Sequence, residues 1–147
     1  MAIIVLVVVP HEGRYLVVEE LDGTWYLPAG KVERGENLIA AAVRETAEEA
    51  GVAIGLRGIL GIEHDPTRFR FAFVGYLAIL TAPKRIADHH TRGAAWKTRA
   101  EIARLPLRHP EVLGWIDRYE KATALLPCSA YHPYNLDVPA PWSAVIG

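Results

Sequence analysis

Three glutamates about a third of the way along the chain have the type and spacing of a metal-binding cluster. Glu45, Glu48 and Glu49 are three and four residues apart, which places their side chains on one face of an α-helix. Like charges this close repel each other, and a divalent cation bound to their oxygens would relieve the repulsion. Carboxylate oxygens on a rigid helix face suit Mg²⁺ or Mn²⁺, with the remaining coordination sites filled by water and substrate phosphates.

The residues around these glutamates predict the helix that would hold them. Asn37 can cap its N-terminus, the alanine- and glutamate-rich run 38–50 favours helix, and Gly51 can end it in the left-handed conformation. A second arc of this helix, turned away by roughly 130° at 100° per residue, is expected to pack on a sheet while the carboxylates face outward or into a cleft. That apolar arc consists of Ile39, Val43, Thr46 and Ala50.

Strand-like segments lie on both sides of the helix. They are residues 2–9, 14–19, 25–27, 52–63, 68–80 and 94–97. The first two are expected to form a hairpin around a turn at residues 10–13, and glycines predict kinks or bulges in 52–63. A short helix is expected at 99–105, capped by Thr98, and a further helix at 110–125. This order predicts an α/β (α+β) fold in which helices cover a mixed β-sheet.

The length of 147 residues fits one domain, expected at residues 1–126, followed by a proline-rich C-terminal tail at 127–147. A net charge of −1 offers no overall basic surface and argues against nucleic acid as a partner. The apolar stretches 2–9 and 72–82 are shorter than the roughly 18 residues that a membrane span needs. With the single cysteine, Cys128, these features predict a cytoplasmic protein. A homodimer is compatible with them.

The glutamates belong to a longer pattern, G-x5-E-x7-R-E-U-x-E-E-x-G-U, in which U is a bulky apolar residue. Val52 fills the last apolar position, and Thr46 stands in for the other. This pattern is the Nudix box, and residues 2–126 resemble the Nudix hydrolase (MutT-like) family. The fixed positions of the pattern are all filled, by Gly30, Glu36, Arg44, Glu45, Glu48, Glu49 and Gly51.

The resemblance implies an α/β/α sandwich and a hydrolase that cleaves a pyrophosphate linkage with Mg²⁺ or Mn²⁺. Carried onto this chain, Glu45 and Glu49 are the principal metal ligands, Glu48 is a further one, and the carbonyl of Gly30 supports the site. Arg44 is implied to hold Glu45, which could also serve as the catalytic base. A lone aspartate in a loop is usually a turn residue. Other candidates for the base nevertheless stay open, and they are His64, Asp65, Asp88 and Glu101.

The substrate is expected to be a small nucleotide or a related pyrophosphate. Trp25 and Tyr26 could stack on a base, Arg70 could reach a phosphate, and Glu36 supports the site beside them. The sequence Leu-Pro-Ala-Gly at 27–30 is similar to that of ADP-sugar pyrophosphatases and of NudJ-type phosphatases, and residues 68–73, 94–96 and 107–110 favour the second group. The motif is also compatible with a non-catalytic nucleotide sensor, or with an enzyme that acts on nucleic-acid 5′ ends.

His89 and His90 resemble a metal-binding pair. Adjacent side chains of an extended segment point to opposite sides of the backbone. The sequence therefore favours a solvated loop at these two histidines.

Overall fold

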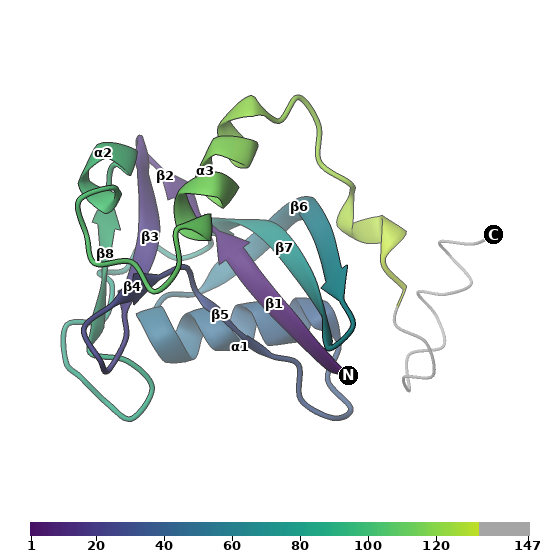
Figure 1. Cartoon of the computed structure of the whole chain (residues 1–147), viewed down its shortest axis with the longest axis horizontal. Helices are drawn as coiled ribbons and strands as arrows, with labels where there is room; N and C mark the ends of the chain where they lie inside the picture. The colour runs from purple at the N-terminus through teal and green to yellow at the C-terminus, as the bar shows by residue number, and fades with distance from the viewer. Residues whose placement is uncertain (133–147) are drawn as a thin grey trace.

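The computed structural model describes residues 1–132, which form two β-sheets and three helices (Figure 1). The strands of the larger sheet are β1 (Ala2–Val8), β5 (Ala29–Lys31), β6 (Ile54–Asp65) and β7 (Arg68–Leu77). Those of the smaller sheet are β2 (Pro10–His11), β3 (Arg14–Glu19), β4 (Trp25–Tyr26) and β8 (Gly93–Lys97). The helices are α1 (Leu38–Ala50), α2 (Arg99–Ile102) and α3 (Glu111–Lys121), with a 3₁₀ turn η1 (Cys128–Ala130) after them.

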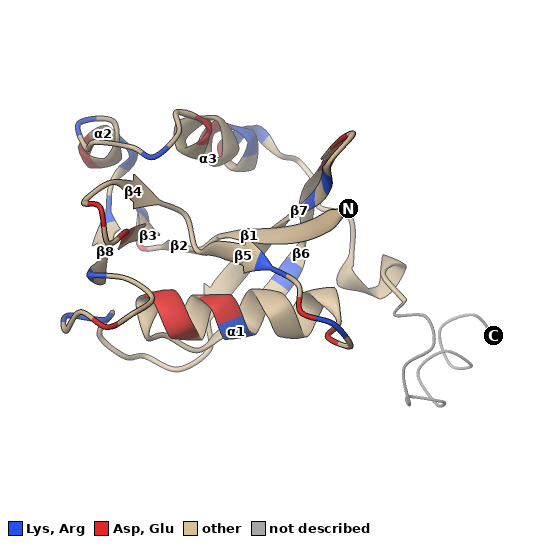
Figure 2. Cartoon of the chain, turned by 60° about the horizontal axis from the view of Figure 1, so that its bottom comes forward, with Lys and Arg blue, Asp and Glu red and all other residues tan. Residues whose placement is uncertain are grey.

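β1 is an inner strand of the larger sheet, whose order is β5-β1-β7-β6. It pairs antiparallel with β5 and parallel with β7. A strand with neighbours on both edges and helices on both faces needs apolar side chains throughout, and residues 5–9 are completely buried. α1 covers one side of the sheets and α2 and α3 lie on the other (Figure 2). The expected α/β/α sandwich with a mixed sheet is confirmed.

The sequence predicts that residues 2–9 pair with residues 14–19 in a hairpin, and this pairing is wrong. Both edges of β1 are taken by β5 and β7, so β3 has no place beside it. The chain instead crosses at Val9 into the smaller sheet, where β2 pairs with β3. Glu12 and Gly13 form the two-residue turn between these strands with φ angles of 50° and 76°, the positive values that tight hairpins favour.

The other elements differ from the sequence prediction mainly at their ends. β6 has the expected irregularities, with register shifts at residues 56–58 and 59–61. β7, α2 and α3 each stop before the last residue expected for them, and residues 29–31, which lie outside the strands expected from the sequence, form β5. Because β7 ends at Leu77, residues 78–92 are free to cross towards α1.

α1 begins and ends as the sequence predicts. The side chain of Asn37 accepts a hydrogen bond from the backbone N–H of Ala40, and Gly51 ends the helix with a φ of 70°. Its buried face is different from the expected arc, because Ile39 and Val43 are only half-buried. The buried residues are Leu38, Ala41, Ala42, Thr46 and Ala50. This rotation turns Glu45 and Glu49, which continue the stripe of Leu38 and Ala42 along the helix, towards β5.

A buried ion pair joins the start of α3 to both sheets. Glu111 accepts two hydrogen bonds of 2.7 Å from the guanidinium of Arg70 on β7, and a third from the hydroxyl of Tyr26 on β4. Arg70 also donates to Glu63 at 2.7 Å. Burial alone would raise the pKa of the Glu111 carboxyl, but the hydrogen bonds from Arg70 and Tyr26 outweigh it and lower that pKa.

Replacing Glu111 by alanine is expected to lower the free energy of unfolding at pH 7 by about 3 kcal/mol, because Arg70 stays buried with one of its two carboxylates gone. The pKa of Glu111 is lower in the folded than in the unfolded chain. Its contribution to stability is therefore complete above the unfolded pKa of about 4.5 and is lost as the pH falls through the folded value. Urea unfolding at pH 7 and pH 3 measures both effects, and a variant that loses as much stability at pH 3 as at pH 7 would contradict the pH argument.

The chain contacts the folded body on both sides of the domain boundary predicted after residue 126, at the last residue of the domain and in the tail. Leu126 forms two backbone hydrogen bonds with Ile59 of β6, and the hydroxyl of Tyr131 accepts one of 3.0 Å from the backbone N–H of Leu38. The remainder of the tail, from residue 133 onwards, lies outside the described residues. Within residues 1–132, no helix has the length and apolar character needed to cross a membrane.

Candidate functional site

Arg44 gathers three carboxylates of the motif around one guanidinium. Its Nε lies 2.6 Å from Glu36, and its Nη1 lies 3.0 Å from Glu45 and 3.1 Å from Glu48. Nη2 reaches the carbonyl of Lys31 at 3.1 Å, which ties α1 to the end of β5. The hydrogen bond from Arg44 lowers the pKa of Glu36. The structure thus brings together residues that the sequence placed on a loop and on a helix.

Glu45 lies directly against the backbone of Gly30. A Cβ added at Gly30 would be 2.2 Å from the carboxyl carbon of Glu45, far closer than two unbonded carbon atoms can approach. Only glycine therefore allows α1 and β5 to come this near at Gly30. The same closeness puts the carboxylate of Glu45 beside the main chain of β5.

Glu49 is held next to Glu45 by the neighbouring residue of β5. Its Oε1 accepts a hydrogen bond of 2.8 Å from the backbone N–H of Ala29. Burial raises the pKa of Glu49 to about 8, and the negative charge of Glu45 adds to the effect. A carboxylate in this position is stabilised by a proton or by a cation.

The donors at this end of α1 suit a hard divalent cation. All are oxygens, Glu45 and Glu49 share one side of the helix, and Gly30 leaves space for their approach to the main chain. Oxygen ligands of this kind are the ones that Mg²⁺ and Mn²⁺ prefer. Within residues 1–132, no three acidic, histidine or cysteine side chains already enclose a metal position, and Arg44 binds one oxygen of Glu45 and one of Glu48.

The residues predicted to contact substrate fall into two groups. Glu36 joins the cluster around Arg44, and Trp25 is half-buried, with the ammonium of Lys97 5.6 Å from its ring centre. Tyr26 and Arg70 are both buried and belong to the ion-pair network of Glu111. The guanidinium of Arg70 is therefore already occupied by two carboxylates.

The other candidate bases are engaged in local structure. Asp65 accepts hydrogen bonds from the backbone and hydroxyl of Thr67 in the β6–β7 turn, and Glu101 forms a capping box with Thr98. His64 stacks on Phe69 at 5.1 Å. Asp88 accepts hydrogen bonds from Lys84 and from two backbone N–H groups of its own loop.

The expectation that His89 and His90 point to opposite sides of the chain is wrong. Their ring centres are 3.9 Å apart, because residues 78–92 form an irregular loop in which the alternation of a strand does not apply. Nδ1 of His90 lies 4.0 Å from the carboxylate of Glu48. The loop therefore reaches the glutamate cluster.

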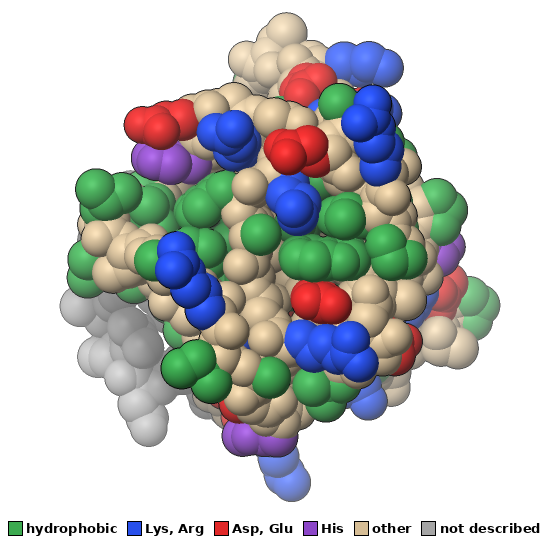
Figure 3. Space-filling model, turned by 90° about the vertical axis from the view of Figure 1, so that its left-hand side faces the viewer, with side chains coloured by type: hydrophobic (Ala, Val, Ile, Leu, Met, Phe, Trp, Pro, Cys, Tyr) green, Lys and Arg blue, Asp and Glu red, His purple; other side chains and the backbone are tan. Residues whose placement is uncertain are grey.

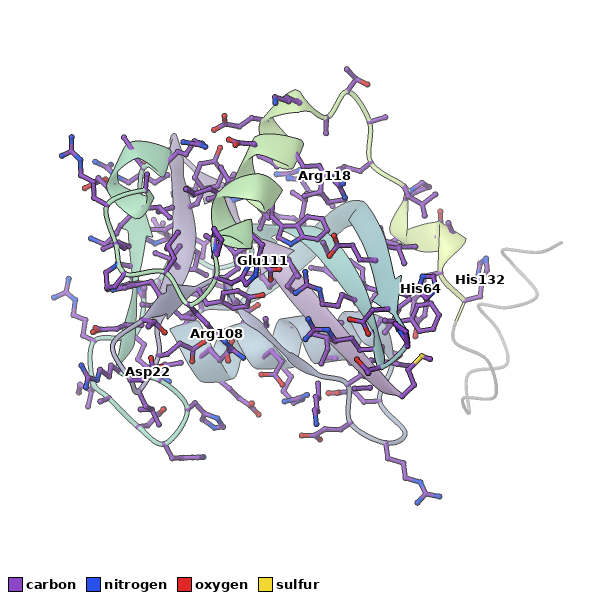
Figure 4. The ribbon with its side chains drawn as sticks, in the orientation of Figure 1. Asp22, His64, Arg108, Glu111, Arg118 and His132 are labelled. Carbon is purple, nitrogen blue, oxygen red and sulfur yellow. The ribbon has the colours of Figure 1, made fainter. Side chains whose placement is uncertain are left out.

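Sequence reasoning also missed Arg108, a cation close to this cluster. Its guanidinium lies 5.1 Å from the ring centre of Tyr26 and 3.3 Å from Glu20. Its charge offsets a small part of the rise that burial causes in the pKa of Glu49. In Figure 4 Arg108 lies below Glu111, the first residue of α3. The backbone N–H of Arg108 donates a hydrogen bond of 2.9 Å to the carbonyl of Trp25. This contact joins distant segments, so no local sequence pattern predicts it.

Comparisons with known proteins place this arrangement in a family. The chain is 32% identical over 122 residues to the human (Homo sapiens) 8-oxo-dGDP phosphatase NUDT18, covering 78% of this chain and 37% of that protein. It is 36% identical over 122 residues to phosphatase NudJ of Shigella boydii, covering 77% of this chain and 79% of NudJ. The chain thus spans little more than a third of the first curated relatives that it matches.

A solved structure with the same fold is a NUDIX hydrolase from Nitrosomonas europaea. It superposes with a TM-score of 0.80 at 30% identity, covering 90% of this chain and 97% of the other. The family model described as NUDIX domain matches residues 1–116, which include the whole glutamate cluster and its β5 partner. The chain therefore belongs to the NUDIX domain family.

Proposed function

We propose that this protein is a divalent-metal-dependent hydrolase that cleaves the pyrophosphate linkage of nucleoside di- or triphosphates, or of related compounds in which a nucleoside diphosphate carries another group. The observation that carries the proposal is the meeting of Glu45 and Glu49 at the backbone of β5, with Arg44 beside them. The names of its relatives, 8-oxo-dGDP phosphatase and phosphatase NudJ, support the same class of reaction.

In this proposal Glu45 and Glu49 are the principal ligands of Mg²⁺ or Mn²⁺, and Glu48 and the Gly30 carbonyl complete the protein's share. When bound, such an ion offsets the charge of the diphosphate and makes a water more acidic. Arg44 orients Glu45 and Glu48 through its two contacts of about 3 Å. Glu36 fixes Arg44 in turn, since it binds both Nε and Nη2 of the guanidinium.

The organic part of the substrate is proposed to lie along β4, where the half-buried ring of Trp25 offers a surface for a base. Tyr26 supports this strand from inside the protein, because its hydroxyl is fixed by Glu111. Arg70 acts in the same way, through Glu111, and does not need to touch the substrate. Arg108, with an exposed guanidinium above Tyr26, is the cation best placed to meet a substrate phosphate.

The test is release of phosphate or pyrophosphate from a panel of nucleoside di- and triphosphates, 8-oxo-dGDP, ADP-ribose and a 5′-triphosphorylated RNA, each with Mg²⁺, Mn²⁺ or EDTA. We expect turnover of at least one free nucleotide with metal and none with EDTA. On the side of the molecule that carries α2 and β8, Lys and Arg side chains are dispersed among acidic and apolar ones (Figure 3), which favours small substrates over RNA. Nucleotide binding without any turnover would contradict the proposed hydrolase and would favour a non-catalytic nucleotide sensor.

Replacing Arg108 by glutamine is expected to raise the KM for the best substrate of the panel about tenfold, with kcat within about twofold. A hydrogen bond from a cation to a phosphate contributes about 1.5 kcal/mol, and this is close to a factor of ten. Arg118 is the matched control, because its guanidinium also lies over an aromatic ring, 4.9 Å from the centre of Trp115, but on α3. Equal increases of KM in R108Q and R118Q would contradict the proposal that Arg108 contacts the substrate.

A further inference from the structure

The loop between β7 and β8 lies against the C-terminal end of α1. The backbone N–H of Lys84 bonds to the carbonyl of Ala50 at 2.7 Å, and the carbonyl of Lys84 accepts from Ala94 at 2.9 Å. Lys84 therefore bridges the end of α1 and the start of β8. The two histidines of this loop precede Thr91, the residue at which the chain makes its second contact with the helix.

The ammonium group of Lys84 is enclosed by this contact. Its side chain is 11% exposed, and Nζ donates to the carbonyl of Glu48, to Asp88 at 2.8 Å and to the hydroxyl of Thr91 at 3.2 Å. An ammonium group has three protons to donate, and all three are used. Asp88 is itself fixed by the backbone N–H groups of His90 and Thr91.

Thr91 completes the contact from inside the protein. It is completely buried, and its hydroxyl donates a hydrogen bond of 2.6 Å to the carbonyl of Glu49 while it accepts one from Lys84. The carbonyls of Glu48, Glu49 and Ala50 thus all bind the loop. In the last turn of a helix these carbonyls have no partner within the helix itself.

α1 has no basic side chain of its own in its last turn. A positive charge at this end of a helix is stabilising, because the carbonyl groups there carry partial negative charge. Lys84 supplies that charge from a distant segment. Lys84 and Thr91 hold the carbonyls of Glu48 and Glu49, two of the three glutamates whose side chains we assign to the cation.

We propose that Lys84, Asp88 and Thr91 form a clamp that positions Glu48 and Glu49 for cation binding, so that the affinity for the metal depends on the β7–β8 loop. The inference rests on the proposed function. The three are positioning residues, since they hold the main chain of the ligands and do not reach the cation themselves. A clamp that served stability alone would leave the metal affinity unchanged when it is weakened.

The test replaces Thr91 by valine, which keeps the shape of the side chain and removes the hydroxyl, and by serine, which restores it. Thr98→Val is the matched control, because it also removes a helix-capping hydroxyl, at the N-terminus of α2. Mn²⁺ affinity is measured by electron paramagnetic resonance on each full-length protein, together with Tm and amide exchange at Glu48–Gly51. Asp88→Asn is a milder second variant, since Asp88 is partly exposed and asparagine keeps the oxygen that accepts from the loop backbone.

We expect T91V to bind Mn²⁺ about tenfold more weakly and to exchange the amides at the end of α1 faster. T91S should lie close to the wild type, D88N between the two, and T98V should lose Tm with its Mn²⁺ affinity unchanged. Wild-type affinity in both T91V and D88N would overturn the clamp, as would an equal loss of affinity in T98V. A wild-type protein that binds Mn²⁺ and turns over no substrate would refute the proposed hydrolase while the comparison of variants still decided the clamp.

Discussion

Replacing Glu49 by glutamine is expected to lower kcat for metal-dependent hydrolysis by at least about a thousandfold. The substitution removes a negative charge at the point where α1 meets β5 and leaves the shape of the side chain unchanged. The glutamine oxygen can still accept the hydrogen bond from Ala29 that Glu49 accepts now. The measurements are turnover of the best substrate and binding of Mn²⁺, both of which should be lost together.

The same variant should be more stable than the wild type when metal is removed with EDTA. Burial raises the pKa of Glu49 to about 8, so the folded protein retains a proton that the unfolded chain releases above about pH 4.5. Stability of the wild type therefore falls as the pH rises from about 4.5 to 8, and glutamine has no such proton to lose. We expect a Tm about 10 °C higher for E49Q at pH 8 and no difference at pH 4. A lower Tm at pH 8 would show that the charged carboxylate stabilises the metal-free fold.

Replacing Gly30 by alanine is expected to reduce kcat/KM by at least about a hundredfold. The added methyl group would occupy the position of the Glu45 carboxylate, at 2.2 Å from its carbon, and would push this side chain away from β5. Gly30 lies in an ordinary extended strand, so the change introduces a collision without straining the backbone. Activity and Mn²⁺ affinity should therefore fall with only a small loss of Tm.

Gly13→Ala is the opposite case and serves as the control. Gly13 has a φ of 76° and no atom within 4 Å of an added Cβ, so alanine there strains the turn without meeting a neighbour. We expect a loss of about 1 kcal/mol in the free energy of unfolding and unchanged kinetics. If G30A were as active as G13A, Glu45 would not need its position against β5.

The helix and its glutamates could be predicted because their signals are local. The cap at Asn37, the left-handed Gly51 and the spacing of Glu45, Glu48 and Glu49 all lie within a few turns of one element, where a period of 3.6 residues decides which side chains meet. The orientation of the helix was harder to predict. Aliphatic residues lie both on the face of α1 that the sequence predicted to be buried and on the face that is buried. The side that carries Ala41 and Ala42 is buried, because these small side chains allow close contact with the sheets.

The rest of the site depends on contacts between segments far apart in the chain. Arg70 reads as an exposed cation in an alternating strand, and it is buried because Glu111, about forty residues later, meets it. Lys84 and Thr91 belong to a loop without periodicity, and their partners are backbone carbonyls, which every sequence has. No local sequence pattern predicts the ion pair of Arg70 and Glu111 or the contacts of Lys84 and Thr91 with α1. The glutamate cluster and its contact with Arg44 could therefore be predicted from the sequence, while the distant residues Lys84, Thr91 and Glu111 could not.

The parallel pairing of β1 with β7 has a consequence for how the chain folds during synthesis. Val8 pairs with Val74, so one edge of β1 has no partner strand until the ribosome has made the whole segment between them. Until then that edge of β1 can pair with strands of other nascent chains. Contacts between residues so distant in sequence also slow folding. We therefore expect β1 to depend strongly on chaperones during synthesis, and truncated products ending before residue 68 should aggregate.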